Sequence, residues 1–169
     1  LYGSDALGGL VSYQSLYPED LLGADENFKI EIPVKFDGSS NQTSGTTRIA
    51  VRDDESGIEG ILVTTVSYGE EDNVKADDKY IDDSEISKKN IYTNIVKNIN
   101  DFSRINLIFE NVDTQRDTTQ AKARLSSLYS SIEEDVDVNR WMGQLGYEYE
   151  NENSGNLFNY AKVNLYVQD

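Results

Sequence analysis

Apolar and polar residues alternate along several separate stretches of this chain, with the two-residue period of strands that bury one face. The alternation is clearest between Trp141 and Glu150, where one side carries only apolar residues and a glycine. Repeated short stretches of this kind predict an all-β protein built on an antiparallel sheet of about seven strands. The predicted strands are 28–36, 46–53, 58–68, 90–99, 104–113, 141–150 and 157–168.

The first predicted strand has apolar residues on one face and a proline on the other. Pro33 has no N–H to give to a neighbouring strand, so the pattern places this strand at a sheet edge or at a bulge. Its apolar face consists of Phe28, Ile30, Ile32, Val34 and Phe36.

The connections between these strands differ in length. Two are long and polar, 69–89 and 114–131, and the second could hold a helical turn near 121–128. The loop at 38–45 is intermediate. Alternation of short and long connections is typical of outer-membrane β-barrels, which have brief periplasmic turns and extended outer loops. The short turns are predicted at 53–57, 100–103 and 151–156.

Aromatic residues gather toward the ends of the predicted strands. This placement suits the girdles that aromatic side chains form at the two surfaces of a membrane. The alternative is that tyrosine, which occurs 11 times, favours strands of any kind. The residues concerned are Phe36, Tyr68, Tyr92, Trp141, Tyr147 and Tyr149.

Charge and composition exclude several classes of function. A formal net charge of −16 argues against binding to nucleic acid or to an anionic membrane surface, because both need clustered Lys and Arg. The chain has no Cys and no His, which removes thiolate chemistry and the commonest general base and metal ligand. No run of about 18 apolar residues predicts a transmembrane helix, but that test does not address strands that cross a membrane.

Clusters of acidic residues raise the question of calcium, which prefers oxygen ligands. The segment 135–139 begins like a calcium-binding loop, but Arg140 stands where the turn glycine belongs and Gly146 where the bidentate Glu belongs. Solvated loop charge is therefore the better interpretation, and no metal ligand is assigned. A weaker calcium site in a loop stays open. The clusters are Asp53-Asp54-Glu55, Glu70-Glu71-Asp72, Asp77-Asp78 and Asp82-Asp83.

No catalytic constellation is present, so we do not expect an enzyme. Glu148 and Glu150 share one strand face, but a glycosidase pair faces across a cleft with one carboxyl in an apolar pocket. The serines lack a histidine partner and a nucleophile elbow. The glycine-rich segment from Gly3 to Gly9 lacks the Lys-Ser/Thr ending of a phosphate-binding loop.

Several stretches resemble TonB-dependent outer-membrane receptors, and within them the haem, haemoglobin and transferrin-type group. Tyr17-Pro18-Glu19-Asp20-Leu21-Leu22 is similar to the link between plug and barrel, and Asn100-Asp101 and Leu145-Gly146-Tyr147-Glu148-Tyr149 resemble early barrel strands. The resemblance implies that 1–16 ends a plug domain, that 17–27 links it to the barrel, and that 28–169 forms the first barrel strands. The segment similar to the end of a plug is Tyr2-Gly3-Ser4-Asp5-Ala6-Leu7-Gly8-Gly9 with Leu10-Val11-Ser12-Tyr13.

The resemblance also implies a function and a location. Receptors of this family take up haem or another iron source across the bacterial outer membrane with energy from the TonB complex. The chain is then expected to be a portion of such a receptor, in contact with outer-membrane lipid. Cargo or its carrier protein would meet the loops at 69–89 and 114–131. Haem enters as transported ligand, with no cofactor in this segment, and no binding residue can be named because the chain has no histidine.

A second interpretation comes from a different class of protein. Seven short strands with acidic loops also fit a soluble all-β sandwich that acts as a binding module, with Ca²⁺ as a candidate ligand. A sandwich requires two sheets that close over a dry core. A third interpretation, an acidic hydrolase, has no base or nucleophile to offer.

Overall fold

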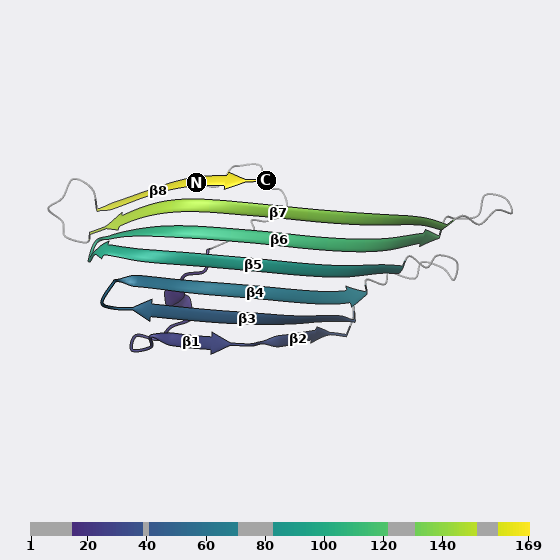
Figure 1. Cartoon of the computed structure of the whole chain (residues 1–169), viewed down its shortest axis with the longest axis horizontal. Coiled ribbons are helices and arrows are strands. Elements are labelled where there is room, and N and C mark those ends of the chain that lie inside the picture. The colour runs from purple at the N-terminus through teal and green to yellow at the C-terminus, as the bar shows by residue number, and fades with distance from the viewer. Residues whose placement is uncertain (1–14, 39–40, 71–82, 122–130, 152–158) are drawn as a thin grey trace.

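The strands of this protein form one open antiparallel sheet (Figure 1). The computed structural model describes residues 15–38, 41–70, 83–121, 131–151 and 159–169. Strand order is β1-β3-β4-β5-β6-β7-β8, and β2 also pairs with β3. The strands are β1 (Phe28–Glu31), β2 (Val34–Asp37), β3 (Gln42–Asp53), β4 (Ile58–Glu70), β5 (Asp83–Asn100), β6 (Ser103–Ala121), β7 (Ser131–Glu150) and β8 (Tyr160–Gln168).

The all-β, antiparallel prediction is confirmed, but the first predicted strand is divided. Ile32 and Pro33 separate β1 from β2, and both strands pair with β3 alone, so the edge position inferred from Pro33 is correct. This division gives eight strands where seven were predicted. The described residues contain a single short helix, η1 (Pro18–Asp20), and no helix long and apolar enough to cross a membrane.

Three predicted loops were too long, and the structure corrects them. β3 already begins at Gln42, β5 includes 83–89, and β6 continues through 114–121. Apart from Ile86 and Ala121 these segments have no large or small apolar side chain that would mark a half-buried strand by alternation, but backbone pairing continues across them. Of the predicted helical turn at 121–128, Ala121 ends β6, and the rest lies outside the described residues, as do 71–82.

The predicted alternation of short and long connections is only partly correct, because the connection from β7 to β8 (151–159) is as long as that from β6 to β7 (122–130) and longer than the predicted turn at 151–156. The β3–β4 and β5–β6 turns and the connection from β7 to β8 lie at one end, which we call the short-turn end. The β4–β5 and β6–β7 connections lie at the opposite, long-connection end (Figure 1). Gly57 completes the first short turn with φ of 62°, and an added Cβ would stand 3.2 Å from the Asn98 carbonyl oxygen.

Strand register assigns every side chain to one of two faces, because directly paired residues in an antiparallel sheet point the same way. One face carries apolar side chains from every strand, and we call it the apolar face. Its central row is Phe28, Val51, Gly60, Ile95, Leu107, Leu145 and Leu165. The opposite, polar face carries the row Arg52, Glu59, Val96, Asn106, Gly146 and Asn164.

The buried apolar core is small and lies on the polar face. Leu21 and Leu22, just after η1, pack against Ala50 and Ile61, whose exposed fractions are 0% and 1%. Leu16, Val63 and Tyr92 border this cluster. The chain segment that precedes β1 therefore folds back over the polar face, and the apolar face has no such cover among the described residues.

Candidate functional site

The apolar face exposes large hydrophobic side chains from one edge of the sheet to the other. Leu107 is 51% exposed and Leu165 is 66% exposed, whereas Ile108, beside Leu107 but on the polar face, is only 1% exposed. Soluble proteins rarely leave so wide an apolar surface uncovered, so this face is the candidate site of contact with an apolar phase or partner. Other members are Ile30, Val34, Phe36, Ile58, Leu62, Val66, Ile91, Ile105, Phe109, Tyr147, Val163 and Val167.

The apolar surface is a band whose limit slants across the strands. On β4 it extends from Ile58 to Tyr68. On β6 the last apolar residue of this face is Phe109, which lies in the same hydrogen-bonded row as Leu62. The limit is therefore nearer to the short-turn end on β6 than on β4.

Beyond the band, toward the long-connection end, the same face becomes acidic. Glu70, Glu85, Asp117 and Asp135 are paired directly with one another across β4, β5, β6 and β7, and we call them the acidic row. All four are exposed. Like charges directly opposite on a sheet destabilise it, so this end of the sheet carries an electrostatic cost.

The polar face is crossed by a segment that we call the strap, residues 15–27. The strap contains η1, which contacts β3, β4 and β5. It is anchored in its first part by the Leu16 carbonyl, which accepts hydrogen bonds from the Tyr92 hydroxyl at 2.8 Å and from Asn94 Nδ2 at 3.0 Å. The Tyr17 amide donates to the Asp20 carboxylate at 2.7 Å and closes the turn of η1.

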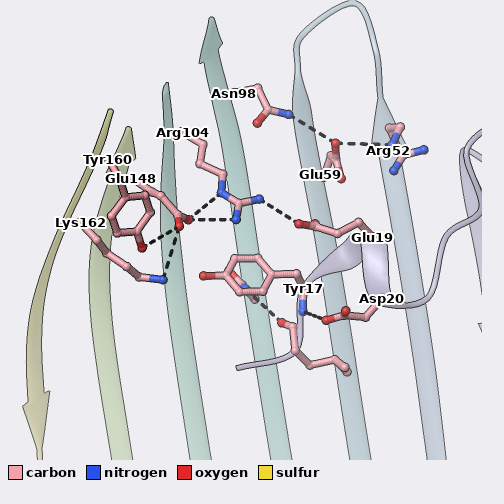
Figure 2. Close-up of polar contacts among 12 residues, drawn as sticks. Tyr17, Glu19, Asp20, Arg52, Glu59, Asn98, Arg104, Glu148, Tyr160 and Lys162 are labelled. Carbon is pink, nitrogen blue, oxygen red and sulfur yellow. Dashed lines mark hydrogen bonds and ion pairs between the residues drawn. The ribbon is translucent and has the colours of Figure 1, made fainter. Parts of the chain in front are cut away.

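Arg104, on β6, joins the strap to the sheet through its charge (Figure 2). Its guanidinium lies 2.9 Å from the Glu148 carboxylate through both Nε and Nη2, and Nη1 lies 2.8 Å from Glu19 Oε1. The guanidinium also stacks 4.8 Å above the Tyr17 ring. Glu148 in turn accepts a hydrogen bond from Tyr160 at 3.2 Å.

A second arginine, Arg52, holds the later part of the strap through the backbone carbonyls of that part. Arg52 Nη1 donates to the carbonyls of Gly23 at 3.1 Å, Ala24 at 3.4 Å and Glu26 at 3.4 Å. Arg52 Nε lies 3.4 Å from Glu59, and both side chains of this pair are about one-seventh exposed (15% and 14%). Glu59 also accepts from Asn98 (Figure 2).

Amide side chains on the polar face pack closely around Gly146. A Cβ at this position would stand 2.0 Å from Asn106 Oδ1 and 2.8 Å from Asn164 Oδ1, so only glycine fits here. Asn106 Nδ2 and Asn94 Oδ1 are buried without a hydrogen-bond partner among the described atoms. Buried amides of this kind carry a desolvation cost that rigid packing must offset.

Open hollows lie along the sheet. One, of about 360 Å³, is lined by Glu110, Val112, Arg140 and Met142 together with the end of β8. Another, of about 210 Å³, is at the short-turn end beside Arg104 and Glu148.

The candidate residues from the sequence lie within strands of the sheet. Glu148 and Glu150 do share a face, but Glu148 is bound to Arg104 and Lys162. Residues 135–139 lie within a strand, so they do not form the loop that a calcium site of this type needs. Tyr92 was wrongly counted with the aromatic girdle, because it lies on the polar face and binds Leu16.

No described group of three or more Asp or Glu side chains could hold a metal ion. The carboxyl of Asp53, in the first short turn, is held by hydrogen bonds from Ser56 and from the Glu55 amide, which lower its pKa. The acidic clusters at 77–78 and 82–83 lie outside the described side chains.

Sequence reasoning missed the two arginines that hold the strap. Arg104 and Glu19 are 85 positions apart, and Arg104 and Glu148 are 44 apart, so no local pattern links them. A partial signal existed, since Arg52 and Arg104 are cations on the polar sides of otherwise alternating strands.

Comparisons with known proteins add no relative. The chain matches no known protein family, no curated protein and no solved structure.

Proposed function

We propose that this chain forms part of the wall of an outer-membrane β-barrel of the TonB-dependent receptor type, which takes up haem or another iron source. The observation that supports this proposal is the two-faced sheet. One face exposes an apolar band that draws side chains from every strand, and the other carries charged and amide side chains and a covering strap. Alternation of lipid-facing apolar and lumen-facing polar residues is the pattern of outer-membrane barrel strands.

The dimensions of the band agree with this proposal. A tilted strand needs about 9–11 residues to cross the hydrocarbon core. On β4 the apolar face runs from Ile58 to Tyr68, a length that fits this requirement, whereas on β5 and β6 the apolar stretches are shorter, Ile91–Ile95 and Ile105–Phe109. The slant of the band across β4 to β6 also agrees with strands that tilt by about 35–45° in a barrel wall.

The edges of the sheet support the same proposal. β1 and β2 at one edge and β8 at the other each have one described neighbour strand. In hydrocarbon, unpaired backbone groups cost several kcal/mol each, so such edges must pair with further strands. The barrel supplies these neighbours, and outer-membrane lipid covers the apolar face.

In the proposed receptor, the two ends of the sheet would face different partners. The long connections at 71–82 and 122–130, outside the described residues, would meet haem or its carrier protein at the cell surface. Energy would come from the TonB complex through the plug. Deletion of 71–82 followed by a measurement of cargo binding tests this contact. Unchanged binding would contradict a role of this connection in cargo binding.

A folding assay on the whole chain tests the proposed location. The chain is refolded into plain buffer, detergent micelles and lipid vesicles, and strand content and oligomeric state are measured in each. We expect native strand content only with detergent or lipid, in oligomers whose edge strands pair between copies, since the apolar face needs an apolar phase and both edges need neighbouring strands. A folded monomer in plain buffer would contradict the proposal and favour a soluble binding module.

A further inference from the structure

The two parts of the strap are held in different ways. Arg52 reaches backbone carbonyls of residues 23–26, and its partner Glu59 is shielded from water. Arg104 reaches the Glu19 side chain, and both are partly exposed, the Arg104 side chain by 33% and the Glu19 side chain by 43%. Exposed ion pairs are weak and are screened by salt, whereas hydrogen bonds to several carbonyls do not depend on the strap's side chains.

The attachment changes at the junction of Leu22 and Gly23. Gly23 begins the clamped part, because its amide donates to Glu26 Oε2 at 2.9 Å and its carbonyl accepts from Arg52. Before it, the amides of Asp20, Leu21 and Leu22 bond only within the strap, to the carbonyls of Tyr17 and Pro18. After it, the Arg52 amide bonds to the Asn27 carbonyl at 2.9 Å and ties the strap to β3.

We propose that the strap is a hinged cover on the polar face, with Arg104 as its latch. Arg52 clamps residues 23–27 to the sheet, and residues 15–22 lift about Gly23. Release of the contacts of Arg104 with Glu19 and Tyr17 makes this lifting more frequent, while Leu16, Leu21 and Leu22 still favour the closed state. Glu148 holds the Arg104 side chain in position, because it binds the guanidinium through two nitrogens and leaves the third for Glu19 (Figure 2).

Lifting uncovers a defined surface. Leu21 and Leu22 leave Ala50 and Ile61, and the Leu16 carbonyl leaves Tyr92 and Asn94. The sheet itself keeps its backbone pairing, so opening is local and costs less than unfolding. The hinged cover does not depend on the proposed transport function, although in a barrel wall it would open the lumen-facing surface.

The test is hydrogen exchange of the folded full chain, read separately for the strap and for the sheet. Glu19→Gln removes the charge on the strap side and keeps the shape of the side chain. We expect exchange of the amides of Asp20, Leu21 and Leu22 to become about three- to tenfold faster, as an exposed ion pair allows. The Glu26 amide and the amides of β4 and β5 keep their rates.

Lys162→Gln is the matched control, because Lys162 lies 3.8 Å from Glu148 and makes no hydrogen bond or ion pair with a described residue of the strap. It should leave all strap rates unchanged. Raising salt should speed strap exchange in the wild type and have little further effect on Glu19→Gln. Unchanged strap exchange in Glu19→Gln would overturn the latch, and equal acceleration of strap and sheet would overturn the hinge.

Discussion

The two faces of this sheet share the same backbone but are covered in opposite ways. On the polar face the chain supplies its own cover, and Leu22 is only 5% exposed beneath it. On the apolar face Leu107 and Leu165 remain exposed, with nothing described above them. The comparison shows that apolar content alone does not locate the core, since most apolar side chains lie on the face that the chain leaves bare.

The largest expected effect comes from placing a charge on the apolar face. Leu145→Arg puts a cation in the central row of the band, and we expect a loss of about 2–4 kcal/mol in folding free energy in lipid vesicles. Urea titration of the vesicle-inserted chain measures this loss. The neighbour Gln144→Arg, on the polar face, is the control and should cost less than about 1 kcal/mol. Equal losses in both variants would remove the distinction between the faces.

The second effect concerns the small core beneath the strap. Leu22→Ala removes buried methyl groups that contact Ala50 and Ile61, and we expect a loss of about 2–3 kcal/mol in the stability of the strap. Leu62→Ala, on the exposed face, leaves no internal cavity and should cost about 1 kcal/mol or less. Protection of strap amides against hydrogen exchange gives the comparison, and a larger loss for Leu62→Ala would reverse it.

Two glycines on β7, one on each face, allow a more direct comparison of the packing on the two faces. Gly146→Ala collides with the Asn106 amide on the polar face, and we expect about 1–2 kcal/mol of destabilisation. At Gly143, on the apolar face, the nearest atom to an added Cβ is Val167 Cγ1 at 3.5 Å, so Gly143→Ala should be neutral or slightly stabilising. The midpoints of thermal or urea unfolding measure both effects. Identical shifts of the midpoint in Gly146→Ala and Gly143→Ala would contradict the assigned packing.

The smallest effect belongs to the acidic row. Raising salt should stabilise the long-connection end of the sheet by a few tenths of a kcal/mol up to about 1 kcal/mol, because it screens four paired carboxylates. Glu85→Gln should remove much of this salt dependence, and Asp54→Asn, in an isolated short turn, should not. Salt titrations of hydrogen exchange in β5 and β6 measure it. A salt effect of the same size in Glu85→Gln would show that the row is not its source.

Strand identity and faces could be predicted from sequence wherever one face meets water and the other does not. Trp141 to Glu150 alternates clearly, and Pro33 correctly placed the first strand at an edge. The strand segments at 83–89 and 114–121 could not be found this way, because apart from Ile86 and Ala121 both of their faces are polar and their pairing comes from backbone groups. Sequence patterns record which face is apolar better than how far a strand extends.

The candidate site was less predictable than the sheet. The contacts of Arg104 with Glu19 and Glu148 bring together three distant segments. The contact with Glu148 needs the β6–β7 register, and the contact with Glu19 forms only once the strap lies on the polar face. Tyr92 shows the same limit. As an aromatic residue near the end of a predicted strand it suited a membrane girdle, but its register places it on the polar face, where it binds the strap. Long-range contacts of this kind depend on the register of several strands at once.

The central claim is that hydrocarbon covers the apolar face, and the single tryptophan tests it most directly. Trp141 lies on this face, paired with Asn111 at the limit of the band. Its fluorescence should be quenched by vesicle lipids brominated close to the headgroup, and less by lipids brominated near the chain ends. In a Trp141→Phe, Leu145→Trp variant the order should reverse, because position 145 lies in the central row. Absence of quenching by any brominated lipid, in a chain that is folded, would contradict the account.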